Sequence, residues 1–276
     1  MMKTTLAVDI GMTNIDLVLQ TPSGVTLKML ANPHLDAAGQ LRQAIQAVGE
    51  LDHDTQIGVT GGRYRNLPEE LDGFTIHKVD EMLAVGLGGL ALAGRGQGLV
   101  VSAGTGTAMV AARGREVHHV TGSAVGGGTL LGLAKLLLGT DDPREIDDLA
   151  LAGDAAAVDI MLQEAVGGEV GRLPAEANAV NLGKLDRAGD YSRENLAAGL
   201  VRLVAQVIAV IAINAANAES LEAIILIGHL MDLVSIRREI ALVGTFYDKT
   251  FIVPENPGFG TVMGVLEALV LTRQTM

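Results

Sequence analysis

Two kinds of hydrophobic pattern alternate along the chain. Short apolar runs that end on turns rich in glycine or proline predict β-strands. Longer stretches in which apolar residues recur at helical spacing predict α-helices. The first pattern predicts strands at residues 6–10, 16–20, 25–30, 56–60, 98–103, 107–112, 223–227 and 250–253. The second predicts helices at residues 36–50, 79–93, 129–138, 144–151, 155–166, 195–218 and 261–271.

The order of these elements indicates an α/β protein. Strands and helices alternate, and no linker rich in Ser, Pro or Gly divides the chain into independent units. We therefore expect two lobes with a cleft between them, each built from a mixed sheet with flanking helices. The segment 195–218 is apolar on nearly all sides, which predicts a buried helix.

Composition and charge narrow the kinds of ligand. The 276 residues include 20 Lys and Arg against 32 Asp and Glu, a formal net charge of -12. Nucleic-acid surfaces need clustered cations and stacking aromatic rings. This chain has no basic run, 4 Phe, 3 Tyr and no Trp, which excludes DNA or RNA as the main partner. A bound anion must instead meet backbone amides, helix N-termini and a cation.

Cysteine content and hydropathy exclude further classes. The chain has no cysteine, which excludes disulfides, thiolate metal sites and cysteine nucleophiles. The most membrane-like segment, residues 207–213, is far shorter than the ~18 apolar residues of a membrane span. Residues 1–9 resemble a strand rather than a signal peptide. We expect a cytoplasmic protein without a membrane partner.

Glycine is unusually frequent, and several glycines follow predicted strands. There are 35 in the chain, which points to tight turns and close approaches of the backbone to a ligand. The first such turn contains Asp9, Gly11 and Thr13. A carboxylate at this position suits Mg²⁺ that also binds ATP phosphates. The alternative is an aspartate that only caps the turn.

Two later segments also place glycines where phosphate could approach the backbone. Gly104, Thr105 and Gly106 would let phosphate reach the backbone, or they form a plain hairpin turn. The segment 126–128, made of Gly126, Gly127 and Gly128, precedes a predicted helix. Amides and the dipole at a helix N-terminus attract anions, so this segment favours phosphate binding over a simple cap. Gly228 ends a late strand and by itself indicates little.

Glu81 is the candidate general base. It lies beside His77, Lys78 and Asp80, between a strand and a helix, where it would face the cleft. There it could take the proton of a hydroxyl that attacks a γ-phosphate. The alternative is an ordinary carboxylate at a helix N-terminus. The motifs of P-loop NTPases, zinc hydrolases and serine hydrolases are absent from the sequence.

Taken together, the glycine-bearing segments resemble the type II (Fumble-type, eukaryotic-like) pantothenate kinases. Each segment is weak alone, but the ordered set runs through nearly the whole chain. The matching segments are residues 8–13, 60–62, 76–81, 102–107, 120–123, 126–133, 153–154, 167–168, 181–184, 225–228 and 258–260. The segment 120–133 is the most specific of them.

The resemblance implies a two-lobed actin-like ATPase fold, of the acetate and sugar kinase, Hsp70 and actin superfamily. That fold has ribonuclease H-like mixed sheets, flanking helices and a central nucleotide cleft. Residues 1–95 would form the N-terminal lobe, with 262–276 packing back on it. Residues 96–261 would form the C-terminal lobe, with nucleotide-binding loops and a dimer helix. The family also implies a homodimer.

The resemblance further implies ATP- and Mg²⁺-dependent phosphorylation of pantothenate to 4'-phosphopantothenate, the first step of coenzyme A biosynthesis. Glu81 matches the family's base and Asp9 its carboxylate near Mg²⁺, an indirect metal contact. Thr105 and His119 match positions in the substrate region. The implied nucleotide- and phosphate-binding residues are Gly11, Thr13, Gly104, Thr105, Gly106, Gly126, Gly127, Gly128 and Gly228.

Four positions depart from the family pattern. Met12 replaces a second glycine, Asp16 a lysine, Ala108 a small hydroxyl residue and His119 an arginine. Two cations are thus lost or weakened, because histidine is only partly charged near neutral pH and lacks the arginine fork. Two alternatives stay open: an ATP-gated regulatory or reactivating protein of this superfold, and a kinase of another small hydroxylated acid or sugar.

Overall fold

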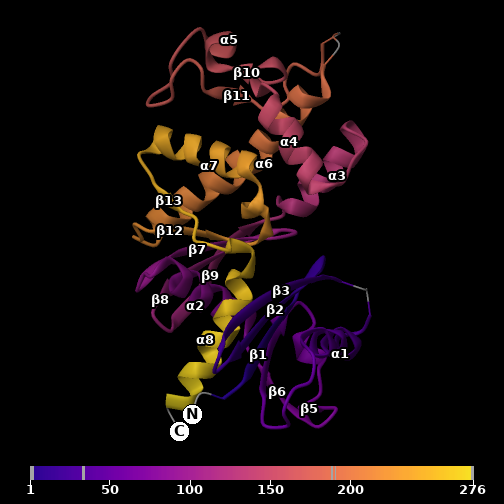
Figure 1. Cartoon of the computed structure of the whole chain (residues 1–276). Coiled ribbons are helices and arrows are strands. Elements are labelled where there is room, and N and C mark those ends of the chain that lie inside the picture. The colour runs from indigo at the N-terminus through magenta and orange to yellow at the C-terminus, as the bar shows by residue number, and fades with distance from the viewer. Residues whose placement is uncertain (1–2, 33–34, 188, 190, 275–276) are drawn as a thin grey trace.

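Two β-sheets organise the computed structural model, which describes residues 3–32, 35–187, 189 and 191–274 (Figure 1). The first sheet has the strand order β3-β2-β1-β4-β6-β5. Its strands β1, β4 and β6 run parallel, and β2 and β3 form an antiparallel hairpin on β1. These strands are β1 Thr5–Ile10, β2 Asn14–Thr21, β3 Gly24–Ala31, β4 Gln56–Gly61, β5 Glu70–Leu71 and β6 Phe74–Lys78.

The second sheet has the order β13-β12-β7-β8-β9. Strand β12 lies parallel to β7 and β13, whereas β7, β8 and β9 are antiparallel neighbours. Its strands are β7 Gln97–Ala103, β8 Thr107–Arg113, β9 Glu116–Ser123, β12 Ile224–Ile227 and β13 Phe251–Ile252. A separate pair, β10 Ile160–Met161 and β11 Asn178–Val180, lies at the far end of the molecule (Figure 1).

Each sheet has its own hydrophobic core. The first packs against α1, with Leu41 and Ala44 fully buried. The second packs against α6, which supplies Leu200, Val204 and Ile208. The helices are α1 Ala37–Val48, α2 Glu81–Ala93, α3 Gly127–Leu137, α4 Pro143–Ala152, α5 Leu162–Val166, α6 Arg193–Ala218, α7 Val234–Tyr247 and α8 Gly260–Gln274. We call the first sheet with α1 the N-terminal lobe, and the second sheet with α3 to α7 the C-terminal lobe.

Helices α2 and α8 lie side by side between the two sheets (Figure 1). Helix α8 packs on β1, β2 and β4, and α2 packs on β7, β8, β9 and β12. Glycine permits their close crossing, because a Cβ at Gly88 would lie 1.8 Å from the Gly260 carbonyl oxygen. A Cβ at Gly264 would lie 1.7 Å from the Ala84 carbonyl oxygen. Part of the glycine excess therefore serves helix contact rather than strand-end turns.

Helix α6 is the one described helix whose length and composition would suit a membrane span. However, 61% of its most apolar stretch is buried inside the protein. Its residues Val201, Ala205 and Ala209 belong to the core of the C-terminal lobe. The burial predicted for segment 195–218 is thus found, and it is the burial of a core helix.

The structure departs from the predicted elements in several places. The helix predicted at 155–166 is wrong, because this segment holds a short 3₁₀ helix, strand β10 and the single turn α5. Strands β5, β6, β9 and β11 and helix α7 have no counterpart among the predicted ranges. Helix α7 lacks a local cap: the Val234 and Ser235 amides donate to Asp147 on α4. A cap supplied by another helix leaves no signal beside the start of α7 in the sequence. The lobe boundary at residue 95 stays a prediction.

Candidate functional site

The turn between β1 and β2, residues 11–13, forms one side of the candidate site. Asp9 is half-buried near the end of β1 and faces Asp16 of β2 in the antiparallel register. A Cβ at Gly11 would lie 2.8 Å from the Asn14 carbonyl oxygen, so glycine lets the turn close tightly. Met12 and Thr13 are exposed at its tip. We call residues 11–13 the first turn.

Asn32 holds the first turn in place, and sequence reasoning missed it. Its backbone amide donates to the Thr13 carbonyl oxygen at 2.9 Å. Its side-chain amide donates to the Gly11 carbonyl oxygen at 2.6 Å. The buried Gln40 of α1 donates in turn to the Asn32 side-chain oxygen at 2.6 Å. Both ends of the turn are therefore fixed by one residue, which follows β3 and carries no recognisable motif.

Glu81 is the first residue of α2 and lies close to Asp9. Strands β1, β4 and β6 are parallel neighbours, so their carboxyl ends share one edge of the sheet. Asp80 caps α2 by accepting hydrogen bonds from the Met82 and Leu83 amides. Burial, followed by the charge of Asp80, raises the pKa of Glu81, and Arg65 opposes this rise. A carboxylate with a raised pKa is better suited to accept a proton near neutral pH.

Asp9 lies within a group of carboxylates. Burial, then the charges of Asp16 and Glu81, raises the pKa of Asp9 to about 7, and only His229 among the named causes lowers it. Such a carboxylate gains from a bound cation. Within the described residues, no group of three or more His, Cys, Asp or Glu side chains could hold a metal alone. Mg²⁺ binding at Asp9 stays a prediction.

The turn between β7 and β8, residues 104–106, faces the first turn from the other lobe. The hydroxyl oxygens of Thr13 and Thr105 are 3.1 Å apart. The Gly104 amide donates to the Gly106 carbonyl oxygen at 2.9 Å, which closes the turn. We call residues 104–106 the second turn. The structure therefore brings together two turns that the sequence predicted separately.

The three glycines at the start of α3 pack directly on the second turn. The Gly127 amide donates to the Gly104 carbonyl oxygen at 2.8 Å, and the Gly128 amide donates to the Thr105 carbonyl oxygen at 2.9 Å. A Cβ at Gly126 would lie 2.7 Å from the Thr105 carbonyl oxygen. Their close packing was not foreseen, and phosphate binding by these glycines stays a prediction.

Gly228 also joins the site, through the backbone that precedes the second turn. Its φ is +97°, and a Cβ would lie 2.4 Å from the Ala103 carbonyl oxygen, so glycine is required on both counts. The next residue, His229, contacts Asp16 of the opposite lobe through Nε2 and Oδ1 at 3.0 Å. Sequence reasoning named Asp16 only as a lost cation and gave His229 no role.

His119 has no described hydrogen bond to the other predicted residues. It is exposed on β9, opposite Val110 of β8. It shares a face of the strand with Val117, which approaches α2 at Gly86. The described contacts do not join it to Asp9 or Glu81. Its role in substrate binding stays a prediction.

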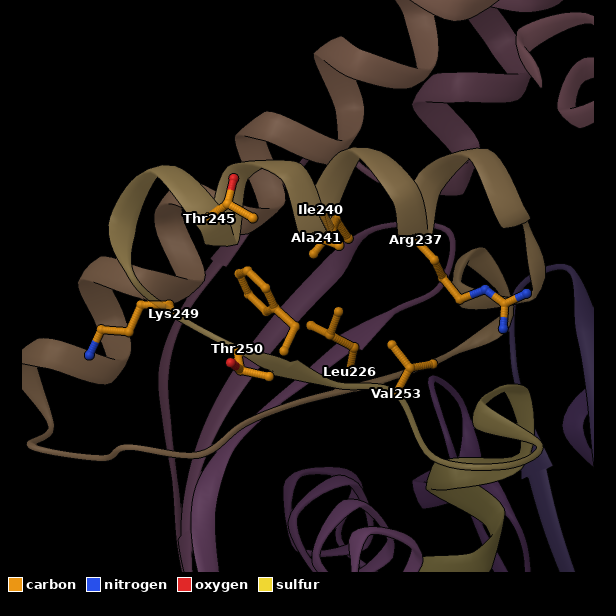
Figure 2. A pocket seen from close by; sticks show the side chains of 9 residues that line it. Leu226, Arg237, Ile240, Ala241, Thr245, Lys249, Thr250 and Val253 are labelled. Atoms are coloured by element: carbon orange, nitrogen blue, oxygen red, sulfur yellow. The ribbon is translucent and has the colours of Figure 1, made fainter. Parts of the chain in front are cut away.

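A cavity of about 210 Å³ lies elsewhere, between α7 and strands β12 and β13 (Figure 2). Leu226 and Ile240 contribute to its apolar lining, and Arg237 and Lys249 lie at opposite ends. The residues that line it within the described ranges include none of the predicted site residues. It therefore does not form part of the candidate site.

Comparisons with known proteins identify the relatives of this chain. Residues 98–252 match the family model named Fumble. A type II pantothenate kinase from Oceanobacillus iheyensis is 27% identical over 175 residues, which cover 61% of this chain and 64% of that protein. A type II pantothenate kinase from Bacillus cereus is 27% identical over 219 residues, which cover 76% of this chain and 80% of that protein. The match thus spans less than two thirds of the Oceanobacillus protein.

Solved structures support the fold. The activator of 2-hydroxyisocaproyl-CoA dehydratase from Clostridium difficile, with bound ADPNP, has a TM-score of 0.66 at 14% identity, covering 98% of this chain and 97% of its own. A ROK family glucokinase from Streptomyces griseus, in complex with glucose and AMPPNP, has a TM-score of 0.58 at 15% identity, covering 96% and 98%. The predicted two-lobed actin-like ATPase fold is confirmed. The family model covers more than half of the chain, and this protein belongs to the Fumble family.

Proposed function

We propose that this protein is an ATP-dependent phosphotransferase that uses pantothenate as its alcohol acceptor. The observation that carries the proposal is the meeting of Asp9, Glu81 and the two turns at one junction between the lobes. Relatives named type II pantothenate kinase support the choice of acceptor. The predicted dimer and cytoplasmic location belong to the same proposal.

Glu81 would accept the proton of the attacking hydroxyl. Its burial at the start of α2 and the neighbouring Asp80 charge raise its pKa, which favours this role over that of a fully solvated carboxylate. The exposed hydroxyls of Thr13 and Thr105 face the space where the two turns meet. They would donate to phosphate oxygens and orient the γ-phosphate toward Glu81.

Asp9 would hold Mg²⁺ indirectly, through a water molecule. The raised pKa of this half-buried carboxyl supports the assignment, because a nearby cation would favour its ionised form. When bound, Mg²⁺ neutralises charge on the phosphates. Gly11, Gly104, Gly106 and Gly228 would let the nucleotide approach the backbone, because they carry no side chains there.

The substitution Glu81→Gln tests the proposed base. It keeps the size of the side chain and removes its ability to take a proton, so we expect kcat for pantothenate phosphorylation to fall by about 10²–10⁴-fold. ATP binding, followed by calorimetry, should change little. Glu69→Gln is the control, because Glu69 is an exposed carboxylate in the same lobe that pairs with Lys78. Wild-type turnover in Glu81→Gln would refute the assignment.

A regulatory protein with nucleotide-driven movement and no small-molecule acceptor is the alternative. The pairing of Asp16 with His229 favours it, because this histidine is already held by Asp16 and Asp232, whereas the resemblance implies a lysine at position 16. The rate of ADP release, measured with and without pantothenate, separates the two. Stimulation by pantothenate supports the kinase, and equal rates support the regulator. Stimulation only by another hydroxylated acid or sugar in a substrate panel would change the acceptor.

A further inference from the structure

His229 connects the two lobes beneath the candidate site. Its Nε2 lies 3.0 Å from Asp16 Oδ1 on β2, and its Nδ1 lies 2.7 Å from Asp232 Oδ2 in its own loop. Asp16 is 213 residues distant in the sequence and belongs to the first sheet. The contact therefore joins the N-terminal lobe to the loop that follows β12 and carries Gly228.

The geometry makes this histidine a cation. An ionised carboxylate only accepts hydrogen bonds, so both ring nitrogens must donate, and the ring must carry two protons. Burial acts to lower the pKa of His229, but hydrogen bonds to Asp16 and Asp232 outweigh it and raise the pKa to about 10. The pair is charge-assisted at neutral pH, which makes it stronger than a neutral hydrogen bond.

The ring is also held by close packing. Phe259 meets it edge-on, with ring centroids 5.8 Å apart. A Cβ at Gly258 would lie 2.3 Å from His229 Nδ1, so a side chain there would displace the ring. The Gly228 amide donates to the Pro257 carbonyl oxygen at 2.8 Å. This hydrogen bond holds the residue before His229 against the segment that carries Gly258 and Phe259. Two carboxylates and two packing contacts thus leave the imidazolium one position.

Two side-chain contacts between the lobes meet here, and they differ in burial. The contact between Thr13 and Thr105 joins two exposed residues at the tips of the turns. The contact between Asp16 and His229 lies deeper, because Asp16 is only 7% exposed. Phosphate that bound between the turns would separate the threonine hydroxyls, which are 3.1 Å apart, without contacting the buried Asp16. The first contact can open while the second persists.

We propose that His229 is a positioning residue that serves as the pivot between the lobes. By holding Asp16, it fixes β2, and through the register of β1 and β2 it fixes Asp9 relative to Gly228 and the second turn. The lobes then separate at the threonines and stay joined at this ion pair. The role of the pivot in phosphate entry rests on the proposed function. The role of the ion pair in joining the lobes does not.

The experiment measures the distance between the lobes in solution. The chain has no cysteine, so Glu50→Cys in the N-terminal lobe and Glu176→Cys in the C-terminal lobe provide two exposed sites for spin labels. Distance distributions are recorded for the ligand-free full chain in the His229→Gln and Asp16→Asn backgrounds. Asp232→Asn is the matched control, because it removes a carboxylate from the same ring without crossing the lobes.

The pivot predicts longer and broader distance distributions for His229→Gln and Asp16→Asn, and a nearly unchanged one for Asp232→Asn. The double variant Asp16→Asn with His229→Gln should be no more open than either single variant. Circular dichroism identifies variants that fail to fold. If a single variant does not fold, the distances are measured in the double variant, in which both members of the ion pair are replaced by neutral side chains. Unchanged distributions in the two cross-lobe variants, or equal broadening in Asp232→Asn, would overturn the proposal.

A kinetic measurement separates this proposal from the proposed function. If pantothenate is phosphorylated, His229→Gln and Asp16→Asn should lower kcat more than Asp232→Asn does, since only they release Asp9 from its position. If wild-type protein fails to phosphorylate pantothenate but the cross-lobe variants still open, the acceptor assignment fails and the pivot stands. Activity without any difference in distance would leave the proposed function intact and refute the pivot.

Discussion

The first and second turns occupy matching positions in the two lobes but are held in different ways. Both are glycine-containing hairpin turns at the end of a lobe's leading strand. The first turn depends on side chains from elsewhere, namely Asn32 and, through β2, His229. The second depends on backbone hydrogen bonds to the start of α3. The first turn should therefore respond to changes in charge and pH. The second turn should respond mainly to added side-chain volume.

Adding a methyl group under the second turn should have the largest effect. In Gly126→Ala, the new Cβ would lie 2.7 Å from the Thr105 carbonyl oxygen. Overpacking of this kind costs about 1–3 kcal/mol of unfolding free energy. We expect this loss in chemical denaturation, together with weaker ATP binding as the turn shifts.

Gly132→Ala is the control for that variant. Gly132 lies on the exposed side of the same helix, and a Cβ there would meet open space. Alanine in a helix interior is favoured over glycine by roughly 0.5–1 kcal/mol, so this variant should be more stable than wild type. If both alanine variants behave alike, the second turn does not depend on close packing.

Removing the donor that holds the first turn should have the next largest effect. Asn32→Asp keeps the shape but leaves the Gly11 carbonyl oxygen without its side-chain donor, a loss of about 1–3 kcal/mol when the group is buried. We expect a raised KM for ATP, because the new charge also faces the site. Gln46→Glu makes the same chemical change on the exposed face of α1 and should leave KM unchanged. Equal KM values in the two variants would contradict the role of Asn32.

Alkaline pH should gradually weaken the ion pair between His229 and Asp16, which supports the first turn through β2. Hydrogen bonds to Asp16 and Asp232 raise the pKa of His229 from its ordinary value of 6.5 to about 10 in the folded protein, although burial opposes the rise. Its contribution to stability is therefore complete below pH 6.5 and disappears as the pH rises through about 10. The groups that face the ring are Asp16 from β2 and Asp232 from its own loop, with Asp9 of β1 nearby.

Unfolding free energies of wild type and His229→Gln test this dependence. Their difference should shrink between pH 6.5 and 10. A difference that stays constant across this range would show that the ring does not carry a charge in the folded state. No such slope is expected for Gly126→Ala, since the second turn is held by groups that do not titrate.

The smallest effect is expected at Met12. This side chain is 75% exposed at the tip of the first turn, so it packs little against the protein. Met12→Gly should change the unfolding free energy by no more than about 0.5 kcal/mol, as surface substitutions usually do. A large loss of stability in thermal unfolding would show that the tip of the turn contributes more than Asn32 does.

The difference between the turns also explains what the sequence could predict. Glycines before α3 and around residues 104–106 are local signals, and the structure brings them together. Glu81 could be proposed as the base from the sequence because it follows a strand and begins a helix. Asn32 and His229 act through contacts with residues distant in the sequence, so no local spacing marks them. Asp16 was interpreted only as the loss of the family's lysine, because its partner His229 lies in the other lobe and far away in the sequence.

Transfer of radiolabelled γ-phosphate from ATP to pantothenate is the most direct test of the central claim. Purified full-length protein with Mg²⁺ should form labelled phosphopantothenate, and Glu81→Gln should form it about 10²–10⁴-fold more slowly. The product is identified by mass spectrometry against an authentic standard. Absence of labelled product from wild-type protein that binds ATP would contradict the proposed function.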